Sequence, residues 1–349
     1  MAIFTETRVL PVSSYRPSRE TLAVAAALLR EGWPVAFPTE TVYGLGGDAL
    51  NPVAVRAIFR AKGRPPNNPL IVHIAEPGQL QELARKIPQV THKLIDWFWP
   101  GPLTLVLKRS PKVPSEVIGR LDTVAVRMPA HPVALALIQE AGTPLAAPSA
   151  NLSGRPSPTT AAHVLRDLNT RIPLILDGGP TSIGVESTVL DVTSSTPVLL
   201  RPGGTTVEQL REVVGRVALS PKAAMLTRSP GTRHRHYQPR VEVVLVLPRA
   251  ELTGVVEQYW SRGLRVGLIC SETARLPRRP DVKVHVLPES ISGFAKGLFA
   301  AIRALEESGV DMIVVQGVEE RGLGLAVMDR LRRAASLVVD EHGQAVVTA

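Results

Sequence analysis

Short apolar segments alternate with helical patterns over most of this chain, and this alternation limits the folds that the chain can adopt. Apolar runs of a few residues predict strands at 35–37, 70–74, 103–107, 124–127, 145–147, 174–176, 188–192 and 198–200. Apolar residues at helical spacing predict helices at 18–30, from Asn51 onward, and at 131–141, 160–168 and 207–214. Strands interleaved with helices build layered domains, so this part of the chain predicts an α/β domain with a mixed sheet.

Residues 216–240 break this pattern. They contain six arginine and lysine residues, three prolines and no acidic residue, a composition typical of a linker. A second alternation follows, with strands predicted at 241–247, 266–270, 282–287 and 312–315 and helices at 250–261, 291–307 and 325–336. The chain therefore predicts three parts: a larger domain at 1–215, a basic linker at 216–240 and a small Rossmann-like α/β domain at 241–349.

Composition narrows the classes of protein to consider. The formal net charge of +9 favours an anionic partner such as a nucleotide or nucleic acid, although a basic chain can also lack such a partner. Cys270 is the only cysteine, so neither an intrachain disulfide nor a cysteine zinc site is expected. The sequence contains no P-loop pattern, no signal peptide pattern and no run of about 18 apolar residues, so we expect a cytoplasmic protein without a membrane partner.

The segment K-G-R-P-P-N-N-P at 62–69 holds two cations in a stiff loop. Lys62 and Arg64 follow a predicted helix, where cations favour the helix dipole, but the dipole does not explain the three prolines that restrict the backbone. A rigid loop with two cations suits a polyanion, because charge already in place costs no reorganisation during a reaction. His73 lies on the strand that follows, where a packed core residue and a site residue are equally reasonable interpretations.

Polar side chains gather at the ends of several other predicted strands. Hydroxyl groups follow the strand at 35–37, in T-E-T-V-Y-G, and the strand at 145–147, in P-S-A-N-L-S-G-R-P-S-P-T. Arg127 and Arg201 end two further strands, and Ser187 precedes another. Ligands of α/β sheets bind at such strand ends, whereas ordinary turn chemistry is the alternative. With Lys62 and Arg64, the two arginines predict a concave basic site in which positioning and charge carry catalysis.

A glycine-rich stretch, G-L-G-G-D-A at 44–49, matches a dinucleotide-binding pattern by letter only. No helix follows directly, as that pattern requires. We expect instead that these glycines let the backbone bend or let a ligand approach closely.

The motifs occur together and in one order along the chain. They are PTETVYGLGGDA (38–49), KGRPPNNPLIVHI (62–74), PGPLTLVL (100–107), VAVRMPAHP (124–132), APSANLSGRPSPT (147–159), GVESTVLDV (184–192) and LLRPGG (199–204). The chain thereby resembles the YrdC/Sua family of threonylcarbamoyl-AMP synthases. The segment SPGTRHRHYQP (229–239) and the small domain after it resemble the two-domain branch of that family. The resemblance implies an N-terminal YrdC-like domain with a twisted mixed sheet and a Sua-type α/β C-terminal domain.

The same resemblance implies an ATP-dependent nucleotidyltransferase. L-threonine and bicarbonate would form a carbamate, which attacks the α-phosphate of Mg-ATP and yields threonylcarbamoyl-AMP and pyrophosphate. A partner transferase would then use the product to make N6-threonylcarbamoyladenosine at tRNA position 37, and a weak direct contact with tRNA is a further expectation. Mg²⁺ is expected to arrive with ATP, without a metal site in the protein.

Individual roles also follow from the resemblance. It places threonine against Thr41, His73, Arg127, Ala147 and Ser187. It places ATP against Arg64, Asn68, Thr123, Ser149, Asn151, Ser157, Arg201 and Tyr237, with Lys62 and Arg64 as the catalytic cations. The planar guanidinium of Arg127 suits a substrate carboxylate. The linker, with Arg233, Arg235 and Tyr237, is expected to lie across ATP as a lid that excludes water.

Two other functions compete with this interpretation. A non-catalytic protein that binds double-stranded RNA or tRNA would also be basic, but such proteins usually interleave basic with aromatic residues, and only 4% of this chain is aromatic. A carbamoyltransferase with a YrdC-type domain would carry cysteine zinc fingers, which a single cysteine excludes.

Overall fold

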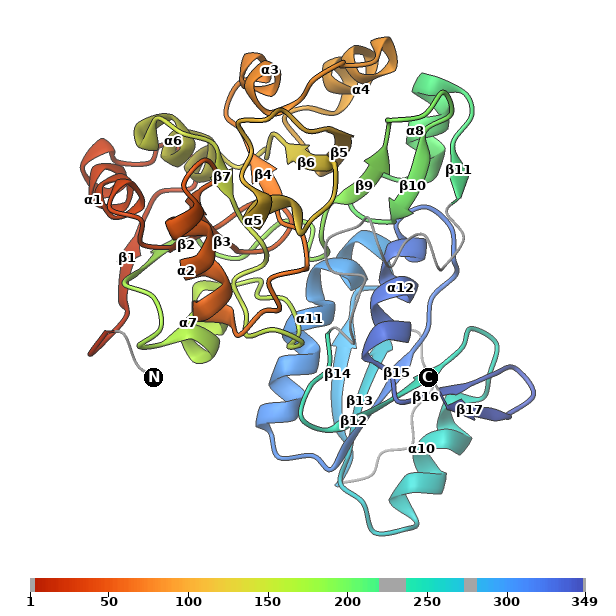
Figure 1. Ribbon diagram of the computed structural model, residues 1–349. Helices are drawn as coiled ribbons and strands as arrows, with labels where there is room; N and C mark the ends of the chain where they lie inside the picture. The colour runs from red at the N-terminus through yellow and green to blue at the C-terminus, as the bar shows by residue number, and fades with distance from the viewer. Residues whose placement is uncertain (1–3, 220–236, 273–280, 348–349) are drawn as a thin grey trace. The chain divides into compact units, whose positions relative to one another are not determined.

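A computed structural model describes residues 4–219, 237–272 and 281–347 of the chain (Figure 1). These residues form two compact units. The first unit contains residues 4–153 and 157–219, and the second contains residues 154–156 and 237–347. Most of the predicted linker, including Arg233 and Arg235, lies outside the described residues.

A mixed sheet forms the centre of the first unit. Its strand order is β1-β8-β2-β3-β7-β4-β6-β5-β9-β10-β11. The strands are β1 (Arg8–Pro11), β2 (Val35–Phe37), β3 (Gly44–Asp48), β4 (Ile71–His73), β5 (Leu103–Lys108), β6 (Thr123–Arg127), β7 (Leu145–Ala146), β8 (Leu174–Asp177), β9 (Thr188–Asp191), β10 (Val198–Arg201) and β11 (Ala218–Leu219). Parallel pairs such as β4 with β6 adjoin antiparallel pairs such as β5 with β6, so the predicted mixed sheet is confirmed.

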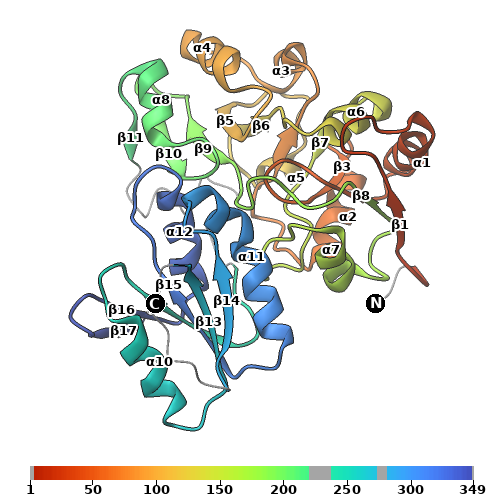
Figure 2. The same cartoon turned by 180° about the vertical axis from the view of Figure 1, so that it is seen from behind.

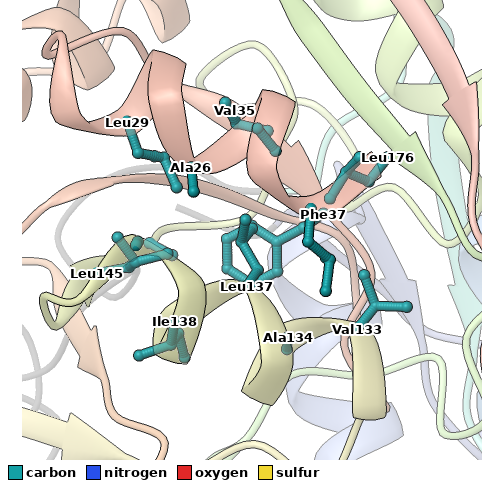
Figure 3. Packing of buried hydrophobic residues seen from close by; sticks show 14 of the residues in the cluster. Ala26, Leu29, Val35, Phe37, Val133, Ala134, Leu137, Ile138, Leu145 and Leu176 are labelled. Atoms are coloured by element: carbon teal, nitrogen blue, oxygen red, sulfur yellow. The ribbon is translucent and has the colours of Figure 1, made fainter. Parts of the chain in front are cut away.

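Helices pack against this sheet. They are α1 (Arg19–Arg30), α2 (Pro52–Lys62), α3 (Leu80–Leu83), α4 (Gln89–Phe98), α5 (Ser115–Ile118), α6 (Pro132–Ala141), α7 (Ala161–Leu168) and α8 (Val207–Val214), with a 3-10 turn at Pro77–Gln79. In both views of the ribbon, α1 and α6 lie side by side, at the β1 end of the sheet (Figure 2). Leu29 of α1 and Leu137 of α6 belong to one buried apolar cluster with Phe37 of β2 (Figure 3).

The glycine-rich stretch at 44–49 corrects an expectation. Residues Gly44–Asp48 form strand β3, which pairs antiparallel with β2 and with β7. A Cβ atom on Gly46 would stand 2.6 Å from the ring of Phe37, and one on Gly47 would stand 3.1 Å from Ile58. Here glycine makes room for core side chains rather than for a ligand, because the sheet and its covering layer approach closely.

The second unit is a smaller α/β layer structure. Its strand order is β14-β13-β15-β12-β16-β17, with parallel pairing except between β16 and β17. The strands are β12 (Glu242–Val246), β13 (Val266–Ser271), β14 (Lys283–Leu287), β15 (Met312–Gln316), β16 (Leu337–Val339) and β17 (Ala345–Val347), and the helices are α10 (Leu252–Trp260), α11 (Ile291–Glu307) and α12 (Gly324–Ala334). This arrangement confirms the predicted α/β class of the C-terminal part.

Successive residues along these strands face opposite sides of the second sheet. Val244 and Val246 pack with Val256 of α10, whereas a Cβ on Gly267 would meet Leu305 of α11. Helices therefore cover both faces, as in doubly wound folds. Cys270 lies in the α10 side of this core, where burial raises the pKa of its thiol to about 11. Within the described residues, no helix combines the length and the apolar character that crossing a bilayer requires.

Candidate active site

Helix α2 delivers Lys62 to the interior of the first unit. Asn51 caps the helix by accepting a hydrogen bond from the Val53 N–H, and Pro52 occupies the first helical position. The helix ends at Gly63, which adopts the left-handed conformation with φ of 61°. Lys62 is thereby the last helical residue, and its side chain is only 2% exposed.

The Lys62 ammonium joins two predicted motifs. Its Nζ donates hydrogen bonds to the main-chain carbonyls of Ser149 and, at 2.5 Å, of Asn151. The Ser153 N–H in turn donates to the Lys62 carbonyl at 2.9 Å. The K-x-R and S-x-N segments are therefore in direct contact although they are almost ninety residues apart in sequence.

Electrostatics at Lys62 favour an anion. Burial lowers the pKa of the Lys62 ammonium well below its usual value, and the nearby charge of Arg64 lowers it further, against the raising effect of Asp167. An ammonium has three N–H donors, and the two described carbonyls use two of them. An approaching phosphate would favour the charged form and could accept the third hydrogen.

Arg64 closes the stiff loop that follows α2. Its Nη2 donates to the carbonyl of Pro69 at 3.1 Å, and the Asn68 N–H donates to the Pro65 carbonyl at 3.2 Å. Arg64 and Asn68 are 9% and 1% exposed. On the α2 side, Arg64 helps to line a hollow of about 600 Å³, together with Val53, Arg56, Phe59, Arg60, Pro66 and Glu116.

Paired strands place a second group of predicted residues in one row. His73 ends β4 and Arg127 ends β6, and the parallel register sets these two residues opposite each other. The Ala147 N–H, just beyond β7, bonds the carbonyl of Ile71 in β4 at 2.9 Å. Thr123 begins β6, so it lies buried at the opposite end of that strand from Arg127, about 13 Å away by strand geometry.

The Arg127 guanidinium is held on several sides. Nη1 donates to Thr41 Oγ1 at 2.9 Å, and Nε donates to the Gly101 carbonyl at 3.1 Å. Nη2 forms an ion pair with Glu40 Oε1 at 2.5 Å, and both side chains are almost fully buried. Burying such a pair is costly unless its geometry is well satisfied, and the three contacts together fix the plane of the guanidinium.

His73 is a neutral group beside this cation. Its side chain is 3% exposed, and burial, followed by the charge of Arg127, lowers its pKa to about 3. Its ring lies edge-on to Phe37 at 6.4 Å between centroids. Nδ1 has no hydrogen-bond partner among the residues that the structure describes. His73 is therefore a packed core residue that lies next to Arg127, and its role as a site residue stays a prediction.

Arg201 and Ser187 contact each other directly. Arg201 Nη2 donates to the Ser187 carbonyl at 2.8 Å and to its Oγ at 3.2 Å. Thr104 Oγ1 and Ser187 Oγ are 2.8 Å apart. A Cβ on Gly203 would stand 2.3 Å from the backbone carbon of Ser187, so the glycine after Arg201 lets the two segments approach.

Hydrogen bonds connect the predicted loops to one another. The Tyr43 N–H donates to Pro158, the Ala150 N–H donates to Tyr43 and the Gly184 N–H donates to Thr41. Ser157 Oγ donates to Glu186 Oε1 at 2.5 Å, with both side chains buried. The loops at 39–44, 147–159 and 183–188 therefore form one connected layer at the strand ends.

Tyr237 is the predicted site residue that belongs to the second unit. It is buried there, and its ring stacks on Phe299 with centroids 5.3 Å apart. The Arg330 guanidinium lies 5.6 Å from the same ring. Its role toward ATP stays a prediction.

Sequence reasoning overlooked several contributors. Glu40 and Glu186 are buried carboxylates that contact predicted site residues, and Thr104 places a hydroxyl next to Ser187. Glu40 lies inside the T-E-T motif and Glu186 lies next to Ser187, so adjacency to predicted residues was the available signal. Among the described residues, no three His, Cys, Asp or Glu side chains are grouped as metal ligands.

Comparisons with known proteins agree with this layout. The family model Sua5_yciO_yrdC, described as Telomere recombination, matches residues 27–203, and the model Sua5_C, described as the threonylcarbamoyl-AMP synthase C-terminal domain, matches residues 205–336. A threonylcarbamoyl-AMP synthase from Pyrococcus abyssi is 49% identical over 90% of this chain and 94% of its own length. One from Bacillus subtilis is 48% identical over 90% of this chain and 92% of its own length.

A solved structure extends the similarity to three dimensions. The crystal structure of Pyrococcus abyssi Sua5 complexed with L-threonine matches with a TM-score of 0.89 at 47% identity, over 94% of this chain and 98% of that chain. Because the similarity spans both parts of the chain, this protein belongs to the Sua5/YciO/YrdC family, in the branch that carries a Sua5 C-terminal domain.

Proposed function

We propose that this chain is an L-threonylcarbamoyladenylate synthase that converts L-threonine, bicarbonate and Mg-ATP into threonylcarbamoyl-AMP and pyrophosphate. The observation that carries the proposal is the buried Lys62 ammonium, which holds the backbone of Ser149 and Asn151 next to Arg64. Two basic side chains held in place beside a hydroxyl-rich loop are suited to a triphosphate, because their positions are set before the reaction begins. The names of the relatives point to the same activity.

Threonine is proposed to bind in the row formed by Thr41, His73, Arg127, Ala147 and Ser187. Arginine has five N–H donors, and hydrogen bonds to Thr41 and Gly101 use only two of those of Arg127, so donors remain for a substrate carboxylate. His73 stays neutral and can donate or accept a hydrogen bond without changing charge. The threonine complex of the Pyrococcus abyssi relative supports an amino acid substrate here.

Catalysis is proposed to rest on charge and position. One oxygen of the threonine carbamate attacks the α-phosphorus of ATP, and the bond from that phosphorus to the bridging oxygen breaks as pyrophosphate leaves with the electron pair. Lys62 and Arg64 stabilise the negative charge that develops on the phosphate oxygens. Mg²⁺ enters as part of the Mg-ATP substrate. The ATP contacts are assigned to Asn68, Thr123, Ser149, Asn151, Ser157, Arg201 and Tyr237 in addition to Arg64.

The finer parts of the function are proposals of the same kind. The enzyme is classed as a nucleotidyltransferase, with residues 1–215 as its catalytic domain, 216–240 as a lid and 241–349 as the Sua-type domain. Its product would pass to a transferase that modifies tRNA position 37, in the cytoplasm. A weak contact with tRNA would be consistent with the net charge of +9.

A reconstitution assay tests the activity. Purified protein is incubated with ATP, Mg²⁺, threonine and bicarbonate. Pyrophosphate release is followed over time, and the nucleotide product is identified by its mass in mass spectrometry. We expect threonylcarbamoyl-AMP and pyrophosphate in equal amounts, and neither when threonine or bicarbonate is left out. Pyrophosphate release that continues without threonine would contradict the proposal.

A further inference from the structure

Three residues in the middle of the predicted ATP loop cluster with the second unit. Residues Gly154–Pro156 group with the C-terminal residues, whereas Ser153 before them and Ser157 after them group with the first unit. Each flank carries site contacts, since Asn151 holds Lys62 and Ser157 holds Glu186. We call residues 154–156 the arch.

The second unit binds the arch through the Arg155 side chain and through two backbone carbonyls. Arg155 makes a bidentate ion pair with Glu306, with Nη1 2.5 Å from Oε1 and Nη2 2.6 Å from Oε2. These two side chains are only 16% and 8% exposed. The Pro156 carbonyl accepts a hydrogen bond from Arg303, which is fully buried, and the Gly154 carbonyl accepts from the Gln238 N–H at 2.9 Å.

One stripe of helix α11 supplies these partners. Phe299, Arg303 and Glu306 are spaced by four and three residues, so they lie on one face of the helix. Phe299 stacks on Tyr237, and Glu306 also accepts the Arg240 N–H at 2.6 Å. The stripe therefore holds both the arch and the described end of the predicted linker.

The surroundings of Glu306 keep its carboxyl group in the charged form that binds Arg155. Burial alone would raise the pKa of its carboxyl group, but the hydrogen bonds from Arg155 and from the Arg240 N–H outweigh burial and lower the pKa below its ordinary value. Glu306 thus stays ionised and can accept hydrogen bonds from both Nη1 and Nη2 of Arg155.

We propose that Glu306 and Arg303 are positioning residues for the ATP site, because they fix the arch and thereby the backbone on either side of it. This inference rests on the proposed function of the loop. Ser149 and Asn151 contribute their carbonyls to Lys62, and a loop that is free in its middle would sample other backbone conformations at both flanks. Helix α11 would thereby order residues 154–156 of the nucleotide loop.

The inference predicts an effect that separates the two substrates. The side chains of Thr41 and Arg127 contact each other, and His73 lies opposite Arg127 in the sheet, so these contacts do not involve residues 149–157. Breaking the ion pair between Arg155 and Glu306, as in Glu306→Gln, should therefore lower kcat/KM for ATP by about 10- to 100-fold. Small misplacements of binding groups have effects of this size. Threonine affinity, measured by calorimetry, should change by less than about twofold.

Hydrogen exchange followed by mass spectrometry tests the arch directly and needs no activity. The reporters are the Ala150 and Ser153 amides, which are bonded to the Tyr43 and Lys62 carbonyls at 2.8 and 2.9 Å. In Glu306→Gln and in Arg155→Gln these amides should exchange at least about tenfold faster, and the double variant should be no faster than either single one. The control is Glu289→Gln, an exposed carboxylate just before α11.

Each outcome decides the inference. Protection of residues 149–153 that stays at the wild-type level in Glu306→Gln would overturn it. If Glu306→Gln loosens the whole second unit, seen as faster exchange throughout β12 to β15, the same criterion is applied to Arg155→Gln. A wild-type protein that makes no threonylcarbamoyl-AMP would remove the proposed function, whereas the exchange result would still show whether α11 orders the loop.

Discussion

The two halves of the candidate site are held by different means. His73 and Arg127 stand on paired strands, so the sheet register places them opposite each other. Ser149 and Asn151 stand on a loop, whose backbone is fixed by the Lys62 ammonium. A side chain on a strand shares the rigidity of the sheet, whereas a loop residue depends on individual anchors. Variants of a loop anchor should therefore be more damaging than variants of the strand row.

Removing the main loop anchor should have the largest effect. Lys62→Ala removes the cation and leaves the Ser149 and Asn151 carbonyls without their donor. We expect a loss of about 2–4 kcal/mol of transition-state stabilisation, measured as kcat/KM for ATP. Lys93→Ala, at an exposed position of α4, is the control. Activity near the wild-type level in Lys62→Ala would refute its role, and Arg64→Ala should lose a similar amount.

A smaller effect is expected in the strand row. Arg127→Lys keeps the charge beside Glu40 but loses the planar fork. Threonine affinity should fall by about 1.5–3 kcal/mol, the usual contribution of a hydrogen bond to a charged group, while ATP affinity should hold. Calorimetric titration with each substrate measures both, with the exposed Arg85→Lys as control. Equal losses for threonine and ATP would mean that the two halves are not separate.

The sheet next to the row can be overpacked at Gly46, which carries no side chain of the site. In Gly46→Ala the new Cβ would stand 2.6 Å from the ring of Phe37, which is fully buried. Overpacking of this kind should lower the free energy of unfolding by about 1–3 kcal/mol in urea titrations. Gly78→Ala, where no atom lies within 4 Å of the new Cβ, should be close to neutral. Equal stability of the two variants would show that the contact between β3 and Phe37 relaxes freely.

The smallest effect concerns pH. The folded pKa of His73, about 3, lies below its unfolded value of roughly 6.5, so the unfolded chain binds the extra proton between these values. Stability from this residue is present above about pH 6.5 and is lost as the pH falls toward 3. Wild type should lose about 1.4 kcal/mol more than His73→Asn between about pH 5.5 and 4.5. Identical slopes for the two proteins would contradict a neutral, buried His73.

Local features of the site were predictable from sequence, because they depend on neighbouring residues. Asn51 and Pro52 mark the start of α2, and Gly63 ends it, which places Lys62 at the helix terminus. The polar strand ends also followed from the alternation of apolar runs, since strand ends in α/β sheets collect ligands.

Partner choice over long distances was not predictable in the same way. Glu40 pairs with Arg127, 87 residues later, and Ser157 bonds Glu186 across 29 residues. Such pairs depend on which strands adjoin, and sequence periodicity does not specify strand order. Gly46 shows the same limit, because its need for space comes from Phe37 on a neighbouring strand. The grouping of Gly154–Pro156 with the second unit has no signal in the loop itself.

The buried pair of Arg127 and Glu40 has a consequence for substrate choice. Their opposite charges cancel, so these two side chains leave the proposed threonine position with little net charge before a substrate binds. An amino acid such as threonine is a zwitterion and preserves this balance. Aspartate or glutamate would bring a surplus negative charge next to Glu40, away from water, where repulsion is strong. Through this electrostatic effect, the pair would favour the binding of neutral amino acids over acidic ones.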